Sequence, residues 1–149
     1  MRVQILVLAA AGFMSIFAAD KCRAQSQEVK VDIPFAFEVE NQQMKSGSYR
    51  VVNMATGAGS LQVVVSSDGK ARVIIPTIRT PSHDTTGTAK LIFHRYGDRY
   101  FLAEILNGDG HARNLFVSQK EKEVMRTQAK IQIPLLARAS ATKTSERHR

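Results

Sequence analysis

The stretch from Leu61 to Pro76 reads Leu-Gln-Val-Val-Val-Ser-Ser-Asp-Gly-Lys-Ala-Arg-Val-Ile-Ile-Pro, and it decides the fold class. Two runs rich in β-branched residues flank Asp68-Gly69, and such side chains favour strands over helices. Asp-Gly between two such runs is a strong signal for a hairpin with a two-residue type I′ turn, in which both central residues need a positive φ. The sequence therefore predicts an antiparallel β-hairpin here.

A second hairpin is predicted around Gly97-Asp98, between strands at 88–96 and 99–106. A two-residue loop sets three cross-strand pairs: Tyr96 with Arg99, Arg95 with Tyr100, and Phe93 with Leu102. In that register Glu104 shares a face with Phe93, and Ile105 lies on the opposite face. Because both faces are largely apolar near the middle, we expect a central hairpin that is covered on both sides.

Apolar and polar residues alternate through most of the remaining chain, which predicts further strands at 29–39, 48–53, 113–117 and 131–135. Pro34 removes a ladder donor, so the first of these is an edge strand or bends there and changes partner. The connections are expected at 40–47 (a polar turn), 54–60 (a glycine-containing loop) and 78–87 (a long polar segment). Ser118-Gln119-Lys120-Glu121 has the form of a capping box, which predicts a short helix as far as about Gln128.

About eight strands and one short C-terminal helix indicate an all-β protein, an antiparallel β-sandwich or, as the alternative, a small closed β-barrel. A chain of 149 residues suits one domain, which we place at 25–137. Residues 138–149 lack apolar periodicity and are expected to form a disordered basic tail. The single cysteine excludes an intramolecular disulfide framework.

Residues 1–24 have the form of a secretory signal peptide. Arg2 precedes an uncharged apolar core at 5–19, which is shorter than the roughly 20 residues that span a bilayer. Small residues favour cleavage after Ala24; an uncleaved anchor is the alternative, and Lys21 disfavours lipidation of Cys22. We therefore expect an exported, periplasmic or extracellular protein that meets the membrane only through the signal peptide before cleavage.

The formal net charge is +8, but much of it lies near the ends of the chain. Without residues 1–24 the chain keeps 18 basic and 12 acidic residues, and the segment from Arg138 holds four of the basic ones against Glu146. An exported protein does not meet intracellular nucleic acid, so no nucleic-acid partner is expected. The partners left open are a polyanion of the cell envelope and a protein that pairs with a sheet edge.

Basic and aromatic residues concentrate at the tip of the second hairpin. Arginine binds carboxylates or phosphates, and tyrosine rings stack on sugars or cations. The candidate ligand-binding residues are therefore Arg95, Tyr96, Arg99 and Tyr100. We favour a structural interpretation over ligand binding. In it, the arginines pair with Asp98 or Glu104 and the tyrosines fill the sheet edges.

No catalytic residue, cofactor or metal site is predicted, because no His-x-His or His-x-x-x-His spacing, P-loop or dinucleotide fingerprint is found. The sequence thus favours a non-catalytic binding or structural protein. One alternative is a small hydrolase with His83, Asp84 and His111 on the loops at 78–87 and 107–113. Another is a lipocalin-like carrier of an apolar ligand, although the chain lacks the tryptophan of that family's Gly-x-Trp motif.

Two stretches carry a resemblance to a known group. Val31-Asp-Ile-Pro-Phe-Ala-Phe-Glu-Val39 and Phe93-His-Arg-Tyr-Gly-Asp-Arg-Tyr-Phe-Leu-Ala-Glu-Ile105 resemble signatures of small exported bacterial proteins without an assigned function. The resemblance implies an exported all-β domain and carries over no catalytic residue. Gly47-x-Tyr49-x-Val51 also resembles a strand of transthyretin-like and collagen-adhesin B-type sandwiches, which favours the sandwich.

Overall fold

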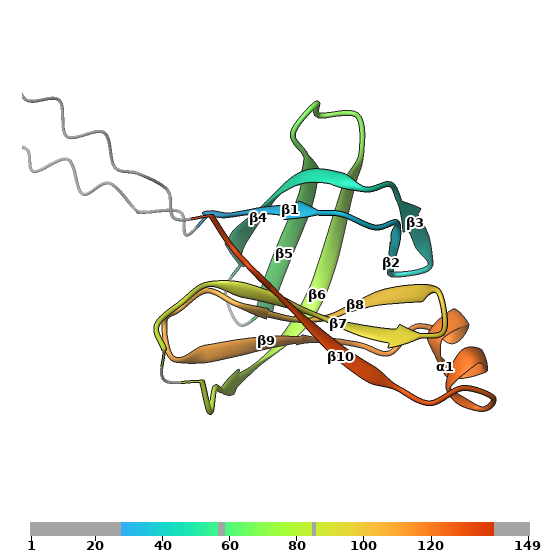
Figure 1. Ribbon diagram of the computed structural model, residues 1–149. Coiled ribbons are helices and arrows are strands. Elements are labelled where there is room, and N and C mark those ends of the chain that lie inside the picture. The colour runs from blue at the N-terminus through green and yellow to red at the C-terminus, as the bar shows by residue number, and fades with distance from the viewer. Residues whose placement is uncertain (1–27, 57–58, 85, 139–149) are drawn as a thin grey trace, which may run out of the picture.

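A computed structural model describes residues 28–56, 59–84 and 86–138, which form ten strands and one short helix (Figure 1). The elements are β1 (Glu28–Ile33), β2 (Phe37–Val39), β3 (Gln42–Met44), β4 (Gly47–Thr56), β5 (Gly59–Ser66), β6 (Arg72–Pro81), β7 (Lys90–Tyr96), β8 (Arg99–Leu106), β9 (His111–Leu115), α1 (Gln119–Met125) and β10 (Ile131–Leu136). The predicted signal peptide and residues 139–149 of the predicted tail lie outside the described residues. The helix in the described part is neither long nor apolar enough to cross a membrane.

The strands form one sheet that folds over into two layers (Figure 1). Its order is β1-β4-β5-β6-β9-β8-β2-β3, and β7 pairs with both β8 and β10. Strand β6 belongs to both layers, because Arg72–Thr77 pair with β5 whereas Thr77–Pro81 pair with β9. All pairings are antiparallel except a single parallel contact between Glu38 of β2 and Phe101 of β8.

Strand β1 meets the residues that follow β10 at one point. Lys30 and Arg138 form an isolated bridge in which the Arg138 N–H donates to the Lys30 carbonyl oxygen at 2.8 Å. Strand β10 otherwise runs along β7, so within the described residues the sheet is not closed into a barrel. The prediction of an all-β sandwich is confirmed and the barrel alternative is wrong.

The core lies between the two layers and consists of the inward residues of the alternating strands. The ring of Phe37 packs edge-on against Tyr49 and Phe93, with centroid distances of 5.1 and 5.5 Å. Other members of this cluster are Val31, Ile33, Val51, Val64, Ile75, Leu91, Leu102 and Ile105. Pro34 separates β1, which pairs with β4, from β2, which pairs with β3 and β8, and this confirms the expected change of partner.

The first predicted hairpin is present, but its turn is longer than expected. Val65 pairs with Arg72, and the Ser66 N–H donates to the Ala71 carbonyl oxygen at 2.9 Å. Gly69 has a φ of 72°, whereas Asp68 has no positive φ, so the predicted type I′ turn is wrong. The Gly69 N–H donates to the Ser66 carbonyl oxygen at 2.8 Å, and the Ser66 hydroxyl donates to Asp68 Oδ1 and accepts from the Ala71 N–H. These bonds hold the longer turn.

The second hairpin has the three predicted cross-strand pairs up to Phe93 and Leu102. Beyond them a β-bulge leaves Ala103 without a partner, so Ile92 pairs with Glu104. The predicted faces of Glu104 and Ile105 are therefore wrong. The bulge keeps both Leu102 and Ile105 in the core and sends Glu104 outward, which avoids burying a carboxylate.

Three segments predicted as connections are partly strands. Strand β4 continues to Thr56 and pairs with β5 from Gly59, which replaces most of the predicted loop at 54–60. Strand β6 extends to Pro81 because it gains a second partner, β9, and the short strand β3 lies within the predicted turn at 40–47. Apolar residues are few and do not alternate over several positions in these segments, so hydrophobic alternation alone could not identify them.

Helix α1 begins where the sequence predicts and ends at Met125, before the expected Gln128. The Ser118 hydroxyl accepts from the Glu121 N–H at 3.2 Å, which confirms the N-cap. The Glu121 carboxylate points to the sheet, where Oε1 accepts from the Tyr96 hydroxyl at 3.1 Å and lies 2.7 Å from His94 Nδ1. The helix therefore covers the outer face of the β7–β8 hairpin near its tip.

Candidate functional site

Two adjoining cavities of about 630 and 300 Å³ lie at the end of the sheet that holds the β3–β4 and β5–β6 turns. Both are lined by Ser48, Tyr49 and Ser67, so together they form one hollow, which we call the basic groove. The larger cavity lies between the two turns, and the smaller one continues onto the outer face of β1 and β4. A hollow of this size suits a short segment of a polymer or a small polar ligand.

Tyr49 forms the base of the groove and fixes one of its turns. Its side chain is buried, and its hydroxyl donates to the Lys45 carbonyl oxygen at 2.6 Å. Burial, with a further contribution from the Asp68 carboxylate, raises the pKa of Tyr49, so the phenol stays neutral and keeps this hydrogen bond. The turn that carries Lys45 is thereby held in one place relative to β4.

Positive charge exceeds negative charge around the groove. Its two carboxylates belong to Asp32 and Asp68, and its cations are Lys30, Lys45, Arg50, Lys70 and Arg138. Asp32 accepts from the Ser48 hydroxyl and pairs with Arg138. Asp68 accepts from the Ser66 hydroxyl at 2.5 Å and from the Lys70 N–H at 3.1 Å, and these bonds lower its pKa. The groove should therefore attract anions.

Three cations of the groove, unlike Arg138, remain accessible because their contacts with carboxylates are long. Lys30 and Arg50 lie 3.8 and 3.9 Å from Glu28 Oε1, and the Lys70 ammonium lies 3.9 Å from Asp68 Oδ2. The Lys70 side chain is 85% exposed. Ion pairs of this length at the surface contribute little and exchange readily with other anions. Arg50 and the two lysines can therefore turn toward a bound ligand.

The tyrosines predicted to bind ligand serve the interior of the protein. Tyr96 is 1% exposed, and its hydroxyl donates to Glu121. Tyr100 stacks on Phe35, with ring centroids 3.8 Å apart and planes within 14°. Both tyrosines thus have structural contacts with partners far away in sequence, but not at the sheet edges where they were expected, because β7 and β8 are flanked by other strands.

The arginines of the hairpin tip are also engaged. Arg99 donates from Nε and Nη2 to Glu38 Oε1 at 3.0 and 2.5 Å, rather than to Asp98 or Glu104. Arg95 donates from Nε to the Gly97 carbonyl oxygen at 2.7 Å. The structure thus gathers the four candidate residues on one hairpin, where internal partners hold them, and ligand binding by them stays a prediction.

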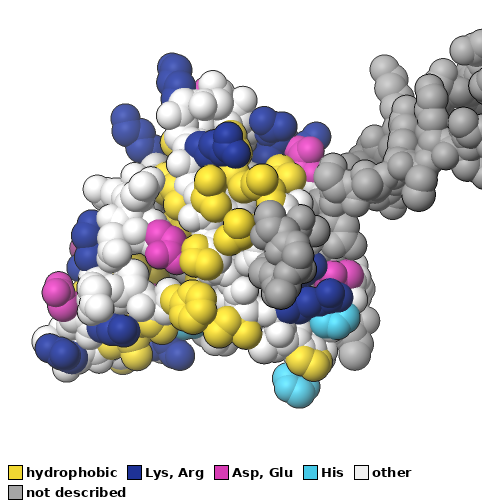
Figure 2. Space-filling view, turned by 180° about the vertical axis from the view of Figure 1, so that it is seen from behind, with side chains coloured by type: hydrophobic (Ala, Val, Ile, Leu, Met, Phe, Trp, Pro, Cys, Tyr) yellow, Lys and Arg dark blue, Asp and Glu magenta, His cyan; other side chains and the backbone are white. Residues whose placement is uncertain are grey.

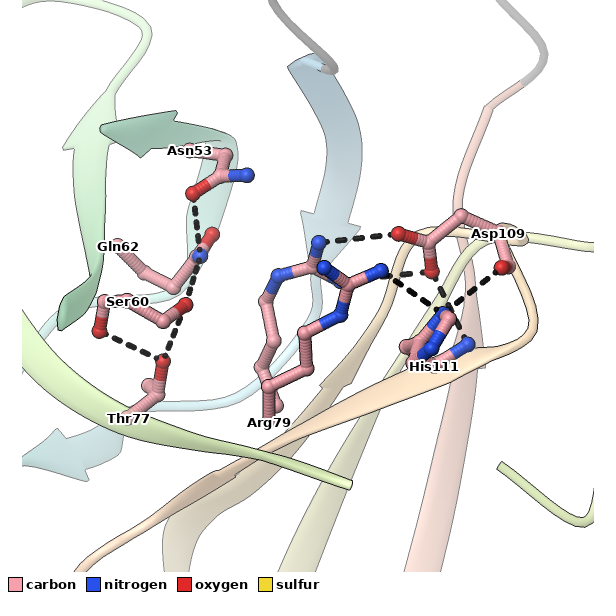
Figure 3. A network of polar contacts seen from close by, with 8 residues as sticks. Asn53, Ser60, Gln62, Thr77, Arg79, Asp109 and His111 are labelled. Atoms are coloured by element: carbon pink, nitrogen blue, oxygen red, sulfur yellow. Dashed lines mark hydrogen bonds and ion pairs between the residues drawn. The ribbon is translucent and has the colours of Figure 1, made fainter. Parts of the chain in front are cut away.

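The residues of the hydrolase alternative have different partners. Asp84 pairs with Lys90, and this contact, with the Thr86 N–H, lowers the pKa of Asp84 to about 2. His111 Nδ1 lies 3.0 Å from both Arg79 Nη2 and the Asp109 carbonyl oxygen (Figure 3). Among the described residues, no three His, Cys, Asp or Glu side chains come together in a way that could hold a metal ion.

A polar network that the sequence did not reveal lies on the inner face of the sheet (Figure 3). Gln62 is 0% exposed and donates from Nε2 to Asn53 Oδ1 at 3.0 Å, while the Thr77 hydroxyl donates to the Ser60 carbonyl oxygen at 3.0 Å. In the alternation of β5, Gln62 occupies the same face as the core residue Val64. A glutamine on the core-facing side of a strand is the feature of the sequence that could have indicated this buried network.

Comparison of the sequence with protein families, with curated proteins and with solved structures found no match. Of the arrangements described above, the basic groove combines a cavity with charged groups that are accessible to a ligand.

Proposed function

We propose that this chain is an exported, non-catalytic protein that binds an anionic polymer of the cell envelope in the basic groove. The observation that carries the proposal is the surplus of accessible cations around two carboxylates that already have partners. The segment at 1–24, with its basic start and apolar core, supports export. Outside the cytoplasm, the available polyanions carry phosphate or carboxylate groups.

The lining of the groove suits a polymer that alternates charged and hydroxyl groups. Lysine and arginine side chains contact phosphate or carboxylate oxygens, and the serine hydroxyls of Ser46, Ser48 and Ser67 offer neutral hydrogen bonds. Each exposed ion pair contributes little, but several along one polymer add up, because the later contacts form within a complex already held together. Such binding weakens as salt rises.

The test measures binding of polyglycerol phosphate and of alginate, with neutral dextran as a comparison, by isothermal titration calorimetry. The double variant Lys45→Gln/Lys70→Gln removes two groove cations, and Lys122→Gln/Arg126→Gln removes two exposed cations of the α1 region. We expect the groove variant to bind at least one of the two polyanions about tenfold more weakly, and the control variant to bind as the wild type does.

Raising the salt from about 0.05 M to about 0.5 M should weaken binding of the polyanion by the wild type. The difference in affinity between the two double variants should be measurable at the lower salt concentration. Equal losses in both double variants would mean that only net charge attracts the polymer, and the proposal would be wrong. Failure of the wild type to bind either polyanion at low salt would also overturn it.

A further inference from the structure

The outer face of β4, β5 and β6 carries an exposed apolar surface. In Figure 2 it forms a broad group of yellow side chains in the middle of the molecule, with dark blue Lys and Arg side chains above it. Ile74 is 53% exposed, Ile78 is 51% and Met54 is 40%. Surfaces of this kind on a single domain mark places where another body binds.

The pairing register orders this face into rows that cross the strands. Lys30 lies opposite Arg50, Arg50 opposite Val65, and Val65 opposite Arg72, so one row carries three cations, and we call it the cationic row. The rows beyond it are apolar apart from Glu28, which lies opposite Val52 and near Lys30 and Arg50. Val63 of these rows is buried, and the other apolar members, which we call the apolar zone, are Val52, Met54, Leu61, Ile74 and Pro76.

Two other groups of outward-facing apolar residues contact the chain itself, whereas Phe116, Ile131 and Leu136 are exposed singly on other strands and segments. Val124 of α1 packs against Tyr96 and Phe101 on the outer side of β7 and β8. The segment that follows β6 lines a cavity together with Ile92 and Leu106. Within the described residues, the face of β4 to β6 lacks such a cover, although it is equally apolar.

We propose that this face docks on the surface of an anionic lipid bilayer. The cationic row would contact lipid phosphates, and the apolar zone, with Ile78 beyond it, would enter the boundary between headgroups and acyl chains. The separation of cations from aliphatic side chains along the strands matches the separation of phosphates from acyl chains along the bilayer normal. Exposed apolar residues on β4 and β6, with the half-buried Leu61 of β5 between them, suit a broad partner such as a bilayer.

A second copy of the chain fits this face less well. Full overlap of two such faces would place either the cationic rows against each other or the cations of one copy over the apolar zone of the other. Both arrangements are unfavourable, since like charges repel and an unpaired charge resists loss of its water. An anionic surface complements Arg50, Arg72 and Lys30 instead. The inference goes beyond the proposed function, because it concerns a different partner and Ile74 and Ile78 do not line the groove. It also replaces the expectation that the chain meets the membrane only through its signal peptide.

The test is co-sedimentation of the full chain with vesicles that contain equal parts of phosphatidylglycerol and phosphatidylcholine, and with vesicles of phosphatidylcholine alone. The face variant is Ile74→Ser/Ile78→Ser, and the matched control is Ile131→Ser/Leu136→Ser, at exposed positions of β10. All variants carry the same N-terminal segment, so a difference among them reports the face. Unchanged melting temperatures establish that the serines have not disturbed the fold.

We expect the wild type and the control variant to prefer the phosphatidylglycerol vesicles, and the face variant to bind them at least about tenfold more weakly. Arg72→Gln should weaken this binding about fivefold, the effect of one basic residue at an anionic surface. Lys45→Gln/Lys70→Gln should retain most of it, which separates this inference from the proposed function.

Equal binding of the face variant and the control variant to the anionic vesicles would overturn the proposal. Equal binding of the wild type to both kinds of vesicle would do so as well. Sedimentation equilibrium supplies the remaining outcome: self-association of the wild type that Ile74→Ser/Ile78→Ser abolishes would make a second copy the occupant, and the lipid proposal would be wrong.

Discussion

At the scale of single residues, Glu121 links the helix to the sheet. Its backbone N–H takes part in the N-cap with Ser118, while its buried carboxylate meets His94 and the hydroxyl of Tyr96. Burial, with a further contribution from the Glu121 carboxylate, raises the pKa of Tyr96 to about 12. The folded protein therefore favours the neutral phenol more strongly than the unfolded chain does.

This shift predicts a loss of stability at alkaline pH. Since the folded pKa lies above the usual value of 10, the contribution of Tyr96 is complete below pH 10 and is lost as the pH rises toward 12. Tyr96→Phe should cost about 1 kcal/mol at neutral pH, because it removes the hydrogen bond to Glu121. Its free energy of unfolding, measured with urea, should then fall less steeply than that of the wild type above pH 10.

The control for this prediction is Tyr100→Phe, which keeps the ring stacked on Phe35. This variant should retain the steeper alkaline loss that Tyr96 causes. If Tyr96→Phe instead lost stability as steeply as the wild type between pH 10 and pH 12, the ionisation of another group would be responsible.

At the scale of elements, the strands followed from the sequence better than the turns did. The alternating residues of β5 to β8 predicted both hairpins, because strand formation there depends on local side-chain pattern. The turn with two positive φ values is not Asp68-Gly69 but Glu40-Asn41, between β2 and β3. A glutamate rarely adopts that conformation, so the residue types at this position did not indicate the turn. The bulge at Ala103 depends on which residues the core accepts.

The glycine turns offer a prediction at this scale. Gly69 and Gly108 have almost the same φ, 72° and 76°. A Cβ on Gly69 meets nothing within 4 Å, whereas a Cβ on Gly108 would lie 2.3 Å from the Gly87 carbonyl oxygen, where backbone must move. Gly69→Ala should therefore cost about 1 kcal/mol, the price of the left-handed conformation, and Gly108→Ala should cost at least about 2 kcal/mol more.

Urea unfolding of the two alanine variants measures this difference directly. Because the dihedral penalty is shared, the comparison isolates the contact with Gly87. Similar losses of stability in both variants would show that the backbone around Gly87 moves aside without a further loss in the free energy of unfolding, contrary to the prediction.

At the scale of the whole molecule, the class was predictable but the order of the strands was not. Alternation shows which residues of a strand share a face, yet it does not reveal that β6 changes partner from β5 to β9. The basic groove was missed for the same reason. Lys30, Lys45 and Lys70 are far apart in sequence and meet only because β1, β4 and the β5–β6 turn lie together. The candidate residues at 95–100 are close together in sequence and were therefore predicted to bind a ligand, although their side chains bind partners within the protein.

The bridge between Lys30 and Arg138 allows a prediction about the closure of the sandwich. Arg138→Ala loses an exposed ion pair with Asp32, which should change the free energy of unfolding by less than about 0.5 kcal/mol. Arg138→Pro also loses the N–H that donates to Lys30 and should cost about 1 kcal/mol more. Urea unfolding distinguishes the two variants, and equal stabilities would mean that the bridge does not tie the two layers together.

The meeting of β1 with the residues that follow β10 also bears on the time at which the chain can fold. The pairing of β7 with β10 and the bridge between Lys30 and Arg138 can form only after nearly the whole described chain has left the ribosome. Contacts between residues so far apart form late, because a long loop must close first. The export proposed above would require an unfolded chain, and a nascent chain that still lacks β10 has not formed all the pairings of its sheet.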